Sequence, residues 1–441
     1  MGLGSKKLSV IIAIVAVTVA AFFGVWFYHL YNDYAEKQKL IKETADADSK
    51  THITVTFMST QSSWSMTIAD LIADFEEENE DIDIEYDIIS ETGFYEDTLN
   101  VLYARGELGD IAEMVNPSFF EKENLLYELP DDITYAVKYV SAYDGKKYAV
   151  GTACYTSGII YNKDIFERYG LSEPKNYDEF IEICETLKNE GVTPIVLAGA
   201  NSWNLSVLLN HYFDNNVLKY NQYWMAEMLS NKASWEDDDV KDMFSDMKEL
   251  FEKGYIDTLW NNTTDIMLPE LMVNGSAAMS YTCSWMVNEV ENLDDETNLG
   301  WFYLPDSNGQ TITDKEVYSY WTITKECSED EDKLEAAERF LRYFYSEGVY
   351  EKTCANITGL SALKRDCDIE YTDMQKEVVD KSTEVDKIFT ISLTNSFVPQ
   401  QFRSYMFELI YPLLEGELDT DELCTSLQER WEEVLEEEEN E

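Results

Sequence analysis

The histidines are the first residues to test for catalytic chemistry, and the chain contains three of them. His29 lies in an apolar run and His52 ends a polar one, so only His211 remains for a folded region. A zinc site of several histidines would therefore lack ligands, and the sequence contains no HExxH pattern. A Ser-His-Asp triad would need His211, which follows the stretch SVLLN without a nucleophile elbow nearby. We predict that His211 is a partly buried helix residue.

Other reactive residues also lack a recognisable arrangement. The sequence contains no GxxxxGK[ST] loop, no GxGxxG loop and no DxDxDG calcium loop. The cysteines are odd in number and none have metal-ligand spacing; they are Cys154, Cys184, Cys283, Cys327, Cys354, Cys367 and Cys424. We therefore predict no cofactor, no metal site and no disulfide framework, with a pair between Cys354 and Cys367 as an alternative.

Paired carboxylates are the remaining option for hydrolysis, because glycosidases use two acidic side chains. The chain has 87 aspartates and glutamates, so some pair is expected by chance and identifies no active site. We predict that the protein is not an enzyme, and an extracellular carbohydrate-active enzyme stays as a less favoured alternative.

Three tryptophans occur in similar surroundings. Trp203 ends the segment GANSW, Trp285 ends SYTCSW and Trp321 ends VYSYW. Each indole lies among small polar residues near a predicted strand end, which is typical of loops. A half-buried tryptophan with its N–H hydrogen bonded is the alternative for each one alone. Together the three predict an aromatic-lined cleft, in which sugar rings could stack on the indoles.

Length and composition limit the class of protein. The chain has 441 residues, a formal net charge of -54 and 45% hydrophobic residues. The length suggests two domains, and the apolar content is sufficient for a large core. The acidic excess repels nucleic acid and anionic lipid headgroups, so neither is an expected partner.

The amino-terminal region has the pattern of a membrane anchor. Residues 8–30 are apolar and long enough to cross a bilayer, and Lys6 and Lys7 precede them. These lysines predict a cytoplasmic amino terminus and an exported remainder. A cleaved signal peptide is the alternative, and no cysteine follows that could carry a lipid. Residues 31–52 are polar and predict a stalk, so the exported fold begins near Ile53.

Strands and helices alternate after the stalk. ITVTFM at 53–58 predicts a strand, the following stretch a helix, and IDIEYDI a second strand. A helix ending at Gly106 and a short strand beginning at Asp110 come next. This order predicts a mainly parallel sheet covered on both sides, with ligands beyond the carboxyl ends of its strands.

A second alternation begins in YNKDIFERYGLSEPKNYDEF, residues 161–180. Asn162 and Asp164 are candidate N-caps of a short helix, and Gly170 suits its left-handed end. Asn176 with Glu179 predicts the capped start of the next helix. The chain therefore starts a second α/β region here.

Five segments in this order resemble the extracellular solute-binding proteins of ABC importers, in the sugar-binding group similar to maltose-binding protein. They are YEDTLNVLYARGELGDI at 95–111, YNKDIFERYGLSEPKNYDEF at 161–180, LKNEGVTPI at 187–195, LMVNGSAAMSYTCSW at 271–285 and EAAERFLRYFYSEGVYEKTCANITGLSALK at 335–364. The resemblance implies a two-lobed α/β fold of the periplasmic-binding-protein type, with hinge crossovers and ligand held between the lobes.

The resemblance also implies domain boundaries and site residues. It places lobe 1 at 53–157 plus 319–357 and lobe 2 at 158–318 plus 358–441, behind a membrane anchor at 1–30 and a stalk at 31–52. The ligand-binding residues that it implies are Trp64, Tyr95, Asp110, Tyr155, Trp203, Trp285 and Trp321, with Phe402 and Arg403 as weaker candidates. Asp110 would accept hydrogen bonds from sugar hydroxyls, with a turn or N-cap role as the alternative.

Two features depart from the family pattern. Gly109 stands where the family often has proline, and no processed cysteine follows the apolar run. We therefore expect a monomer that is anchored at the extracellular face of the cytoplasmic membrane, or secreted if the signal is cleaved. It would bind a small solute, most simply a mono- or oligosaccharide, and deliver it to ABC permease subunits. A surface receptor without transport on the same scaffold is the alternative.

Overall fold

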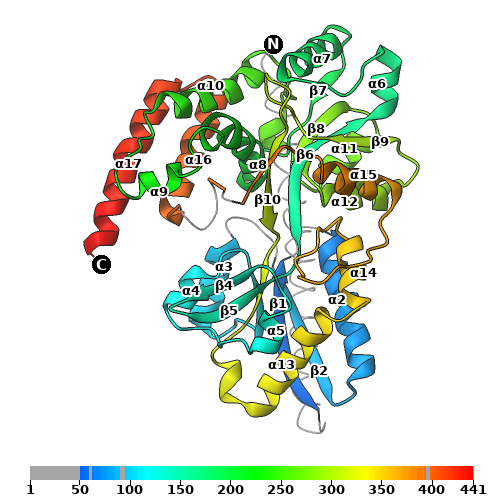
Figure 1. Cartoon of the computed structure of the whole chain (residues 1–441), viewed down its shortest axis with the longest axis vertical. Coiled ribbons are helices and arrows are strands. Elements are labelled where there is room, and N and C mark those ends of the chain that lie inside the picture. Colours follow the sequence, from blue (N-terminus) through cyan, green and yellow to red (C-terminus); the bar gives the residue numbers. More distant parts are fainter. Residues whose placement is uncertain (1–49, 59–61, 90–94, 391, 394–397, 441) are drawn as a thin grey trace, which may run out of the picture. The chain divides into compact units, whose positions relative to one another are not determined.

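The first of two sheets contains the amino-terminal strands. In a computed structural model of the chain, residues 50–58, 62–89, 95–390, 392–393 and 398–440 are described. Its strands are β1 (Thr51–Met58), β2 (Ile82–Ile89), β3 (Ile111–Met114), β4 (Val140–Tyr143), β5 (Lys146–Gly151) and β11 (Tyr320–Ile323), in the order β2-β1-β3-β11-β5-β4. β1 and β3 are parallel, whereas β11 is antiparallel to both β3 and β5. The late strand β11 therefore lies in the middle of the first sheet, whose strands β1, β2, β4 and β5 are labelled in Figure 1.

Helices from both ends of the sequence accompany this sheet. They are α2 (Ser62–Glu78), α3 (Tyr95–Arg105), α4 (Ser118–Lys122), α5 (Asp131–Thr134), α13 (Glu331–Phe344) and α14 (Val349–Ala355), with a 3-10 turn at Cys327–Glu329. Phe75 of α2 packs edge-on against Phe340 of α13, with ring centroids 5.5 Å apart. This contact joins segments more than 250 residues apart, and we call the sheet with these helices lobe 1.

The second sheet has a different set of strands. They are β6 (Cys154–Asn162), β7 (Thr193–Ile195), β8 (Ala277–Cys283), β10 (Ile312–Val317) and β12 (Lys387–Phe389), in the order β12-β10-β6-β8-β7, and β9 (Leu299–Phe302) pairs with β6. Every residue of β8 is buried, as expected for a strand covered on both faces. We call this sheet with its helices lobe 2.

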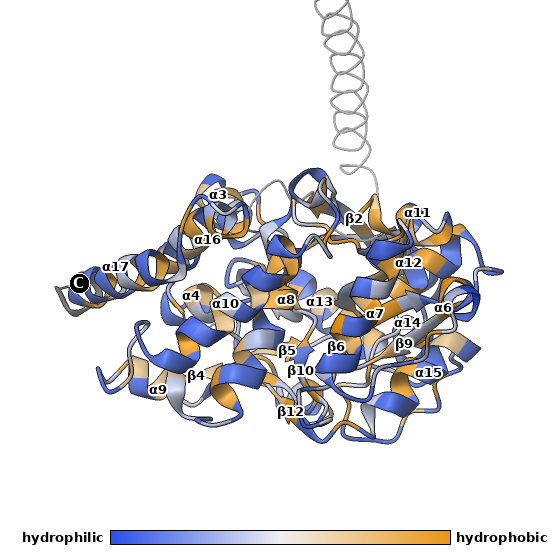
Figure 2. Cartoon of the chain, turned by 90° about the horizontal axis from the view of Figure 1, so that it is seen from above, coloured by the Kyte–Doolittle hydropathy of each residue, from blue (hydrophilic) through white to orange (hydrophobic). Residues whose placement is uncertain are grey.

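Lobe 2 carries most of the helices. They are α6 (Lys163–Tyr169), α7 (Tyr177–Asn189), α8 (Ser202–Tyr212), α9 (Trp224–Met228), α10 (Asp238–Glu252), α11 (Leu268–Val273), α12 (Met286–Leu293), α15 (Asp373–Ser382), α16 (Gln400–Leu414) and α17 (Thr420–Asn440), with a π-helix at Phe213–Leu218 and a 3-10 turn at Trp260–Asn262. Hydrophilic residues run along much of α17 (Figure 2), where Leu427 and Trp431 are buried and Glu432 and Glu433 are exposed. Part of the acidic excess therefore lies on solvated helix faces.

The N-caps predicted at Asn162 and Asn176 are confirmed, whereas Asp164 lies within the first turn of α6 and does not cap it. The Asn162 side chain accepts a hydrogen bond from the amide of Ile165 at 3.0 Å, and Gly170 ends α6 at φ 66°. Asn176 caps α7 by accepting from the amide of Glu179 at 2.9 Å. His211 is buried in α8, as its apolar surroundings predicted. These are local hydrogen bonds, so short sequence patterns suffice to predict them.

The chain changes lobe between β5 and β6 and again between β10 and β11. The backbone amide of Thr152 donates a hydrogen bond to the carbonyl of Ser319 at 2.8 Å. The backbone amide of Tyr318 likewise donates to the carbonyl of Ala153 at 2.8 Å. The two crossovers are therefore hydrogen-bonded to each other. β6 belongs to the second sheet from Cys154 onward, a few residues before the boundary expected between 157 and 158. A third passage adjoins the first, because Leu360 donates its amide to the carbonyl of Cys154.

The expected anchor at 1–30 and residues 31–49 of the expected stalk lie outside the described residues. Within the described part of the chain, no helix has both the length and the apolar character that crossing a membrane requires.

Candidate ligand-binding site

The lobes contact each other at the amino end of α2. The amide of Ser63, in the first turn of α2, donates to Glu289 Oε1 of α12 at 3.0 Å. Asn292, also in α12, donates its amide nitrogen to Ser63 Oγ at 2.9 Å. The first amides of a helix have no partner within the helix, and its amino end favours negative charge. A carboxylate of lobe 2 therefore fills an anion-favouring position of lobe 1.

Three of the expected aromatic residues lie just beneath this contact in lobe 1. Trp64 of α2 stacks near Trp321 of β11, with ring centroids 6.3 Å apart, and lies 5.0 Å from the ring of Tyr318. Tyr95, at the start of α3, donates its hydroxyl to the carbonyl of Glu113 at 2.9 Å. The exposed fractions of Trp64, Tyr95 and Trp321 are 0%, 2% and 0%. In this structure they support the junction and have no open face for a ligand.

Glu113 of β3 is a buried carboxylate at the same junction that the sequence analysis did not single out. It accepts hydrogen bonds from the amide of Met58 at 2.9 Å and from Trp64 Nε1 at 3.0 Å, and from the hydroxyl of Ser319. Burial raises the pKa of the Glu113 carboxyl to about 7, although these hydrogen bonds lower it. The signal in the sequence is one acidic residue within the otherwise apolar strand IAEM.

Asp110 lies at the opposite end of β3. Its carboxylate accepts a hydrogen bond from the amide of Thr54 at 2.9 Å and pairs with Lys333 Nζ at 3.1 Å. Both partners belong to lobe 1. Asp110 precedes β3, whereas Met58 is the last residue of β1 and Ser63 lies in α2, which follows β1. This position favours the alternative role for Asp110, a turn residue that ties β1 and β3 to α13, over contact with a ligand.

Trp203 and Trp285 come together in lobe 2. Their ring centroids are 5.4 Å apart at an interplanar angle of 45°. Trp203 lies in the first turn of α8 and is half-buried, and its buried indole nitrogen has no hydrogen-bond partner among the described residues. Trp285 immediately precedes α12, one helical turn before Glu289. Of the three tryptophans expected to share a cleft, two are therefore adjacent, while Trp321 lies with Trp64 in lobe 1.

Tyr155 lies beside a group of buried carboxyls. It is half-buried in β6 and pairs with Glu316 of β10 across the sheet. Asp314 and Asp214 are also buried, and neither carboxylate oxygen of Asp214 has a hydrogen-bond partner among the described residues. Burial raises the pKa of Asp214 well above its usual range, and the charges of Asp314 and Glu316 raise it further. Burial therefore favours the protonated forms of these carboxyls, and a protonated carboxyl can both donate and accept hydrogen bonds.

A charged contact between the lobes involves Arg403 of α16. Burial lowers the pKa of its guanidinium, and the charges of Glu96 and Asp97 in α3 oppose this effect. Burial likewise raises the pKa of Glu96, and Arg403 opposes it. Phe402, the neighbouring residue, packs 5.0 Å from Trp235 and 5.0 Å from Trp431 within lobe 2. The position of Arg403 is thus held by an aromatic cluster of lobe 2 while its charge acts on lobe 1.

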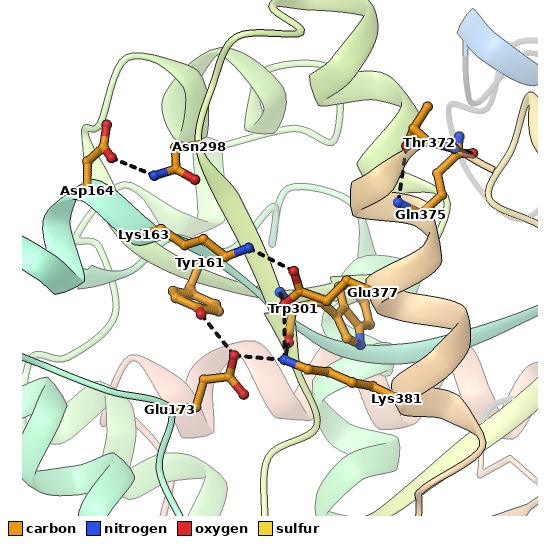
Figure 3. Close-up of polar contacts among 10 residues, drawn as sticks. All are labelled: Tyr161, Lys163, Asp164, Glu173, Asn298, Trp301, Thr372, Gln375, Glu377 and Lys381. Carbon is orange, nitrogen blue, oxygen red and sulfur yellow. Dashed lines mark hydrogen bonds and ion pairs between the residues drawn. The ribbon is translucent and has the colours of Figure 1, made fainter.

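Lobe 2 also contains a polar hollow of about 710 Å³ between α12 and α15. At its wall Lys163 pairs with Glu377 at 2.7 Å, and Lys381 lies between Glu377 at 3.0 Å and Glu173 at 2.7 Å (Figure 3). Tyr161 donates its hydroxyl to Glu173 at 2.9 Å. Each of these charges is matched within the group. The group therefore ties β6 to α15 and does not present free charge to a solute.

The described residues include aromatic and carboxyl groups that suit the binding of a polar ligand. Burial lowers the pKa of His211 to about 3, so its imidazole is neutral, and its ring packs against Tyr281 at 5.1 Å. No group of three or more metal-ligating side chains is present within the described ranges. Aromatic faces and uncharged carboxyls can stack and hydrogen-bond a polyhydroxyl ligand.

The chain is similar to several known proteins. A multiple sugar-binding protein of Streptococcus mutans is 24% identical over 337 residues, which cover 70% of this chain and 75% of the relative. A chitin oligosaccharide binding protein superposes with a TM-score of 0.77 at 21% identity, covering 88% of this chain and all of that protein. A sugar transporter protein of Bacillus licheniformis in complex with stachyose superposes with a TM-score of 0.71 at 20% identity, covering 86% and 99% of the two chains.

These likenesses confirm the two-lobed fold that the resemblance implied. The model of a family described as bacterial extracellular solute-binding protein matches residues 59–351, which include Trp64, Glu113 and Trp285 and both crossovers. The chain belongs to the family of bacterial extracellular solute-binding proteins.

Proposed function

We propose that the protein captures a carbohydrate between its lobes outside the cell and delivers it to an ABC permease. The observation that carries the proposal is the Trp203–Trp285 pair, which lies one helical turn from the interlobe contact of Glu289. Stacking on sugar faces is a common use of such paired indoles, and the unpartnered Trp203 nitrogen can donate to a hydroxyl. The names of the relatives and of the solved neighbours agree, since each of the three refers to a sugar or an oligosaccharide.

The site residues divide into two groups under this proposal. Tyr155 and Trp203, which are half-buried, contact the ligand, and Trp285, which is 3% exposed, packs against Trp203 and holds it in place. Trp64, Tyr95 and Trp321 support the lobe 1 side of the site, because their side chains are buried. Closure of the lobes on the ligand creates the surface that the permease recognises.

The apolar residues 8–30 determine where the protein is located. As an uncleaved anchor, they would hold the binding lobes at the extracellular face of the cytoplasmic membrane, near the permease. Tryptic peptides that start before residue 8 in protein recovered from the membrane fraction would support the anchor. Their absence, with protein released into the medium, would show cleavage.

A thermal-shift screen of the full chain in detergent tests ligand capture. Stachyose, raffinose, chitin oligosaccharides and maltotriose are the first probes, with short peptides and polyols beside them. A sugar that binds the folded state raises the unfolding midpoint by mass action. Trp285→Ala should abolish that shift, whereas Tyr220→Ala, at a tyrosine of lobe 2 that is 73% exposed, should retain it. Shifts with peptides alone would overturn the sugar assignment.

A further inference from the structure

Glu113 joins segments that must move relative to one another when the lobes open. Its Oε2 accepts hydrogen bonds from the amide of Met58, at the end of β1, and from Trp64 Nε1, in the first turn of α2. Its Oε1 accepts from the hydroxyl of Ser319, in the crossover between β10 and β11. One side chain therefore binds the α2 end of lobe 1 to a segment that leads into lobe 2.

The chain of contacts continues into the other crossover. Ser319 Oγ lies 2.9 Å from Thr152 Oγ1, and Thr152 Oγ1 lies 3.0 Å from the carbonyl of Ser319. Thr152 connects β5 of lobe 1 to β6 of lobe 2. Both residues are buried, so these bonds are shielded from solvent. Glu113 thus reaches both crossovers through a single hydroxyl.

The carboxylate has no cation beside it within the described residues. The groups that face it are Trp64 from α2, the backbone of β1, Ser319 from the crossover and Trp321, its cross-strand neighbour in β11. The nearby titratable side chains are the tyrosines Tyr95 and Tyr318, and Tyr95 donates to the backbone carbonyl of Glu113. Burial raises the pKa of Glu113 to about 7, so the carboxyl changes its charge near neutral pH.

We propose that Glu113 is a positioning residue that couples both crossovers to the α2 end of lobe 1 and thereby controls lobe closure. The ionised carboxylate accepts all three hydrogen bonds. When Oε1 carries a proton, it donates to Ser319 Oγ, and the Ser319 hydroxyl must turn to donate to Thr152 Oγ1. Protonation therefore reverses one hydrogen bond and keeps the crossovers attached. The ionised carboxylate is buried without a cation among the described residues, and opening of the lobes hydrates it, so ionisation favours the open form. The inference rests on the proposed function in that closure serves ligand capture.

The test measures the distance between the lobes in the full chain without added sugar. Bioorthogonal spin labels replace Tyr135 of lobe 1 and Tyr220 of lobe 2, which are 79% and 73% exposed. Between pH 5.5 and 8.5 the wild-type distance distribution should shift toward longer, more open distances at high pH, with a midpoint near 7. Glu113→Gln should remain at the low-pH distribution throughout, because its amide can replace the protonated carboxyl.

Two further variants make the test decisive. Glu121→Gln, which changes another buried carboxyl of lobe 1, in α4, should keep the wild-type profile. Ser319→Ala removes a hydrogen bond that lowers the pKa of Glu113, so it should move the midpoint of the distance change to higher pH. If Glu113→Gln does not fold, the Ser319→Ala result decides the test. A flat wild-type profile, or a Glu113→Gln profile that still titrates, would overturn the proposal. If the distances titrate but no sugar binds, the proposed function fails and this inference stands.

Discussion

The carboxylate of Glu289 gives the sharpest prediction about lobe closure. It lies in α12 of lobe 2, is half-buried, and accepts the amide of Ser63 at the start of α2 in lobe 1. Replacing Glu289 with alanine leaves that amide without its partner only when the lobes are closed. In the open form water can hydrate both groups. The substitution should therefore destabilise the closed form selectively.

The magnitude follows from helix capping. Loss of a capping side chain at a helix amino end costs about 1 kcal/mol, within a range of roughly 0.5–2 kcal/mol. Because about 1.4 kcal/mol is tenfold in an equilibrium constant, closure should weaken about fivefold. If only the closed form holds ligand tightly, the dissociation constant should rise by the same factor. Glu289→Gln keeps an acceptor oxygen but loses the charge, so it should weaken closure by less than Glu289→Ala does.

Isothermal titration with the sugar identified in the thermal screen measures the dissociation constant, and the interlobe spin-label distance reports closure directly. Glu291→Gln is the matched control, because Glu291 lies in the same helix but accepts the hydroxyl of Thr372, within lobe 2, at 2.8 Å. If Glu289→Ala and Glu291→Gln bind with equal affinity and show equal distances, the interlobe cap makes no contribution and the reasoning is refuted.

Three other predictions concern charge and stacking. The pKa of the Glu113 carboxyl is about 7 in the folded chain and 4.5 without the fold. Its contribution to stability is therefore present below pH 4 and is lost as the pH rises through 7, by about 3 kcal/mol. Glu113→Gln should therefore be more stable than wild type in urea unfolding at pH 8 and similar at pH 4; equal stability at both values would contradict the assignment. Lys333→Ala leaves the buried Asp110 carboxylate without its cation and should lower stability by about 1–2 kcal/mol in the same assay. Sugar affinity should not change in that variant, and a tenfold loss would restore Asp110 as a ligand residue. Trp203→Ala should weaken sugar binding by about 1 kcal/mol more than Trp203→Phe, which keeps an aromatic face, in titration calorimetry; equal losses would argue against stacking.

Much of the fold could be predicted from short patterns. The caps at Asn162 and Asn176 and the glycine end at Gly170 depend on hydrogen bonds and backbone angles within a few residues. Alternating strands and helices predicted the α/β class for the same reason. The family resemblance extended the prediction from an α/β class to a two-lobed fold. The five segments that carry it occur in the same order as the strands and helices of such a fold.

The arrangement of the site could not be obtained in this way. Trp321 resembles Trp203 and Trp285 in its local sequence, yet β11 inserts between β3 and β5 and buries it against Trp64. Asp110 finds its cation on Lys333, 223 residues away, and Glu113 gains Ser319 from a crossover 206 residues away. No local pattern carries such information, because burial depends on which strands pair.

The sequence by itself determined the class of fold and the acidic character, since these depend on composition and on interactions between near neighbours, and its resemblance to known proteins gave the family. Only the tertiary structure decided which aromatic residues line the junction and which support it. It also decided that Glu289 caps α2 across the lobes and that Glu113 reaches both crossovers. The physical reason is that desolvation and long-range hydrogen bonds exist only once the two sheets have brought distant segments together.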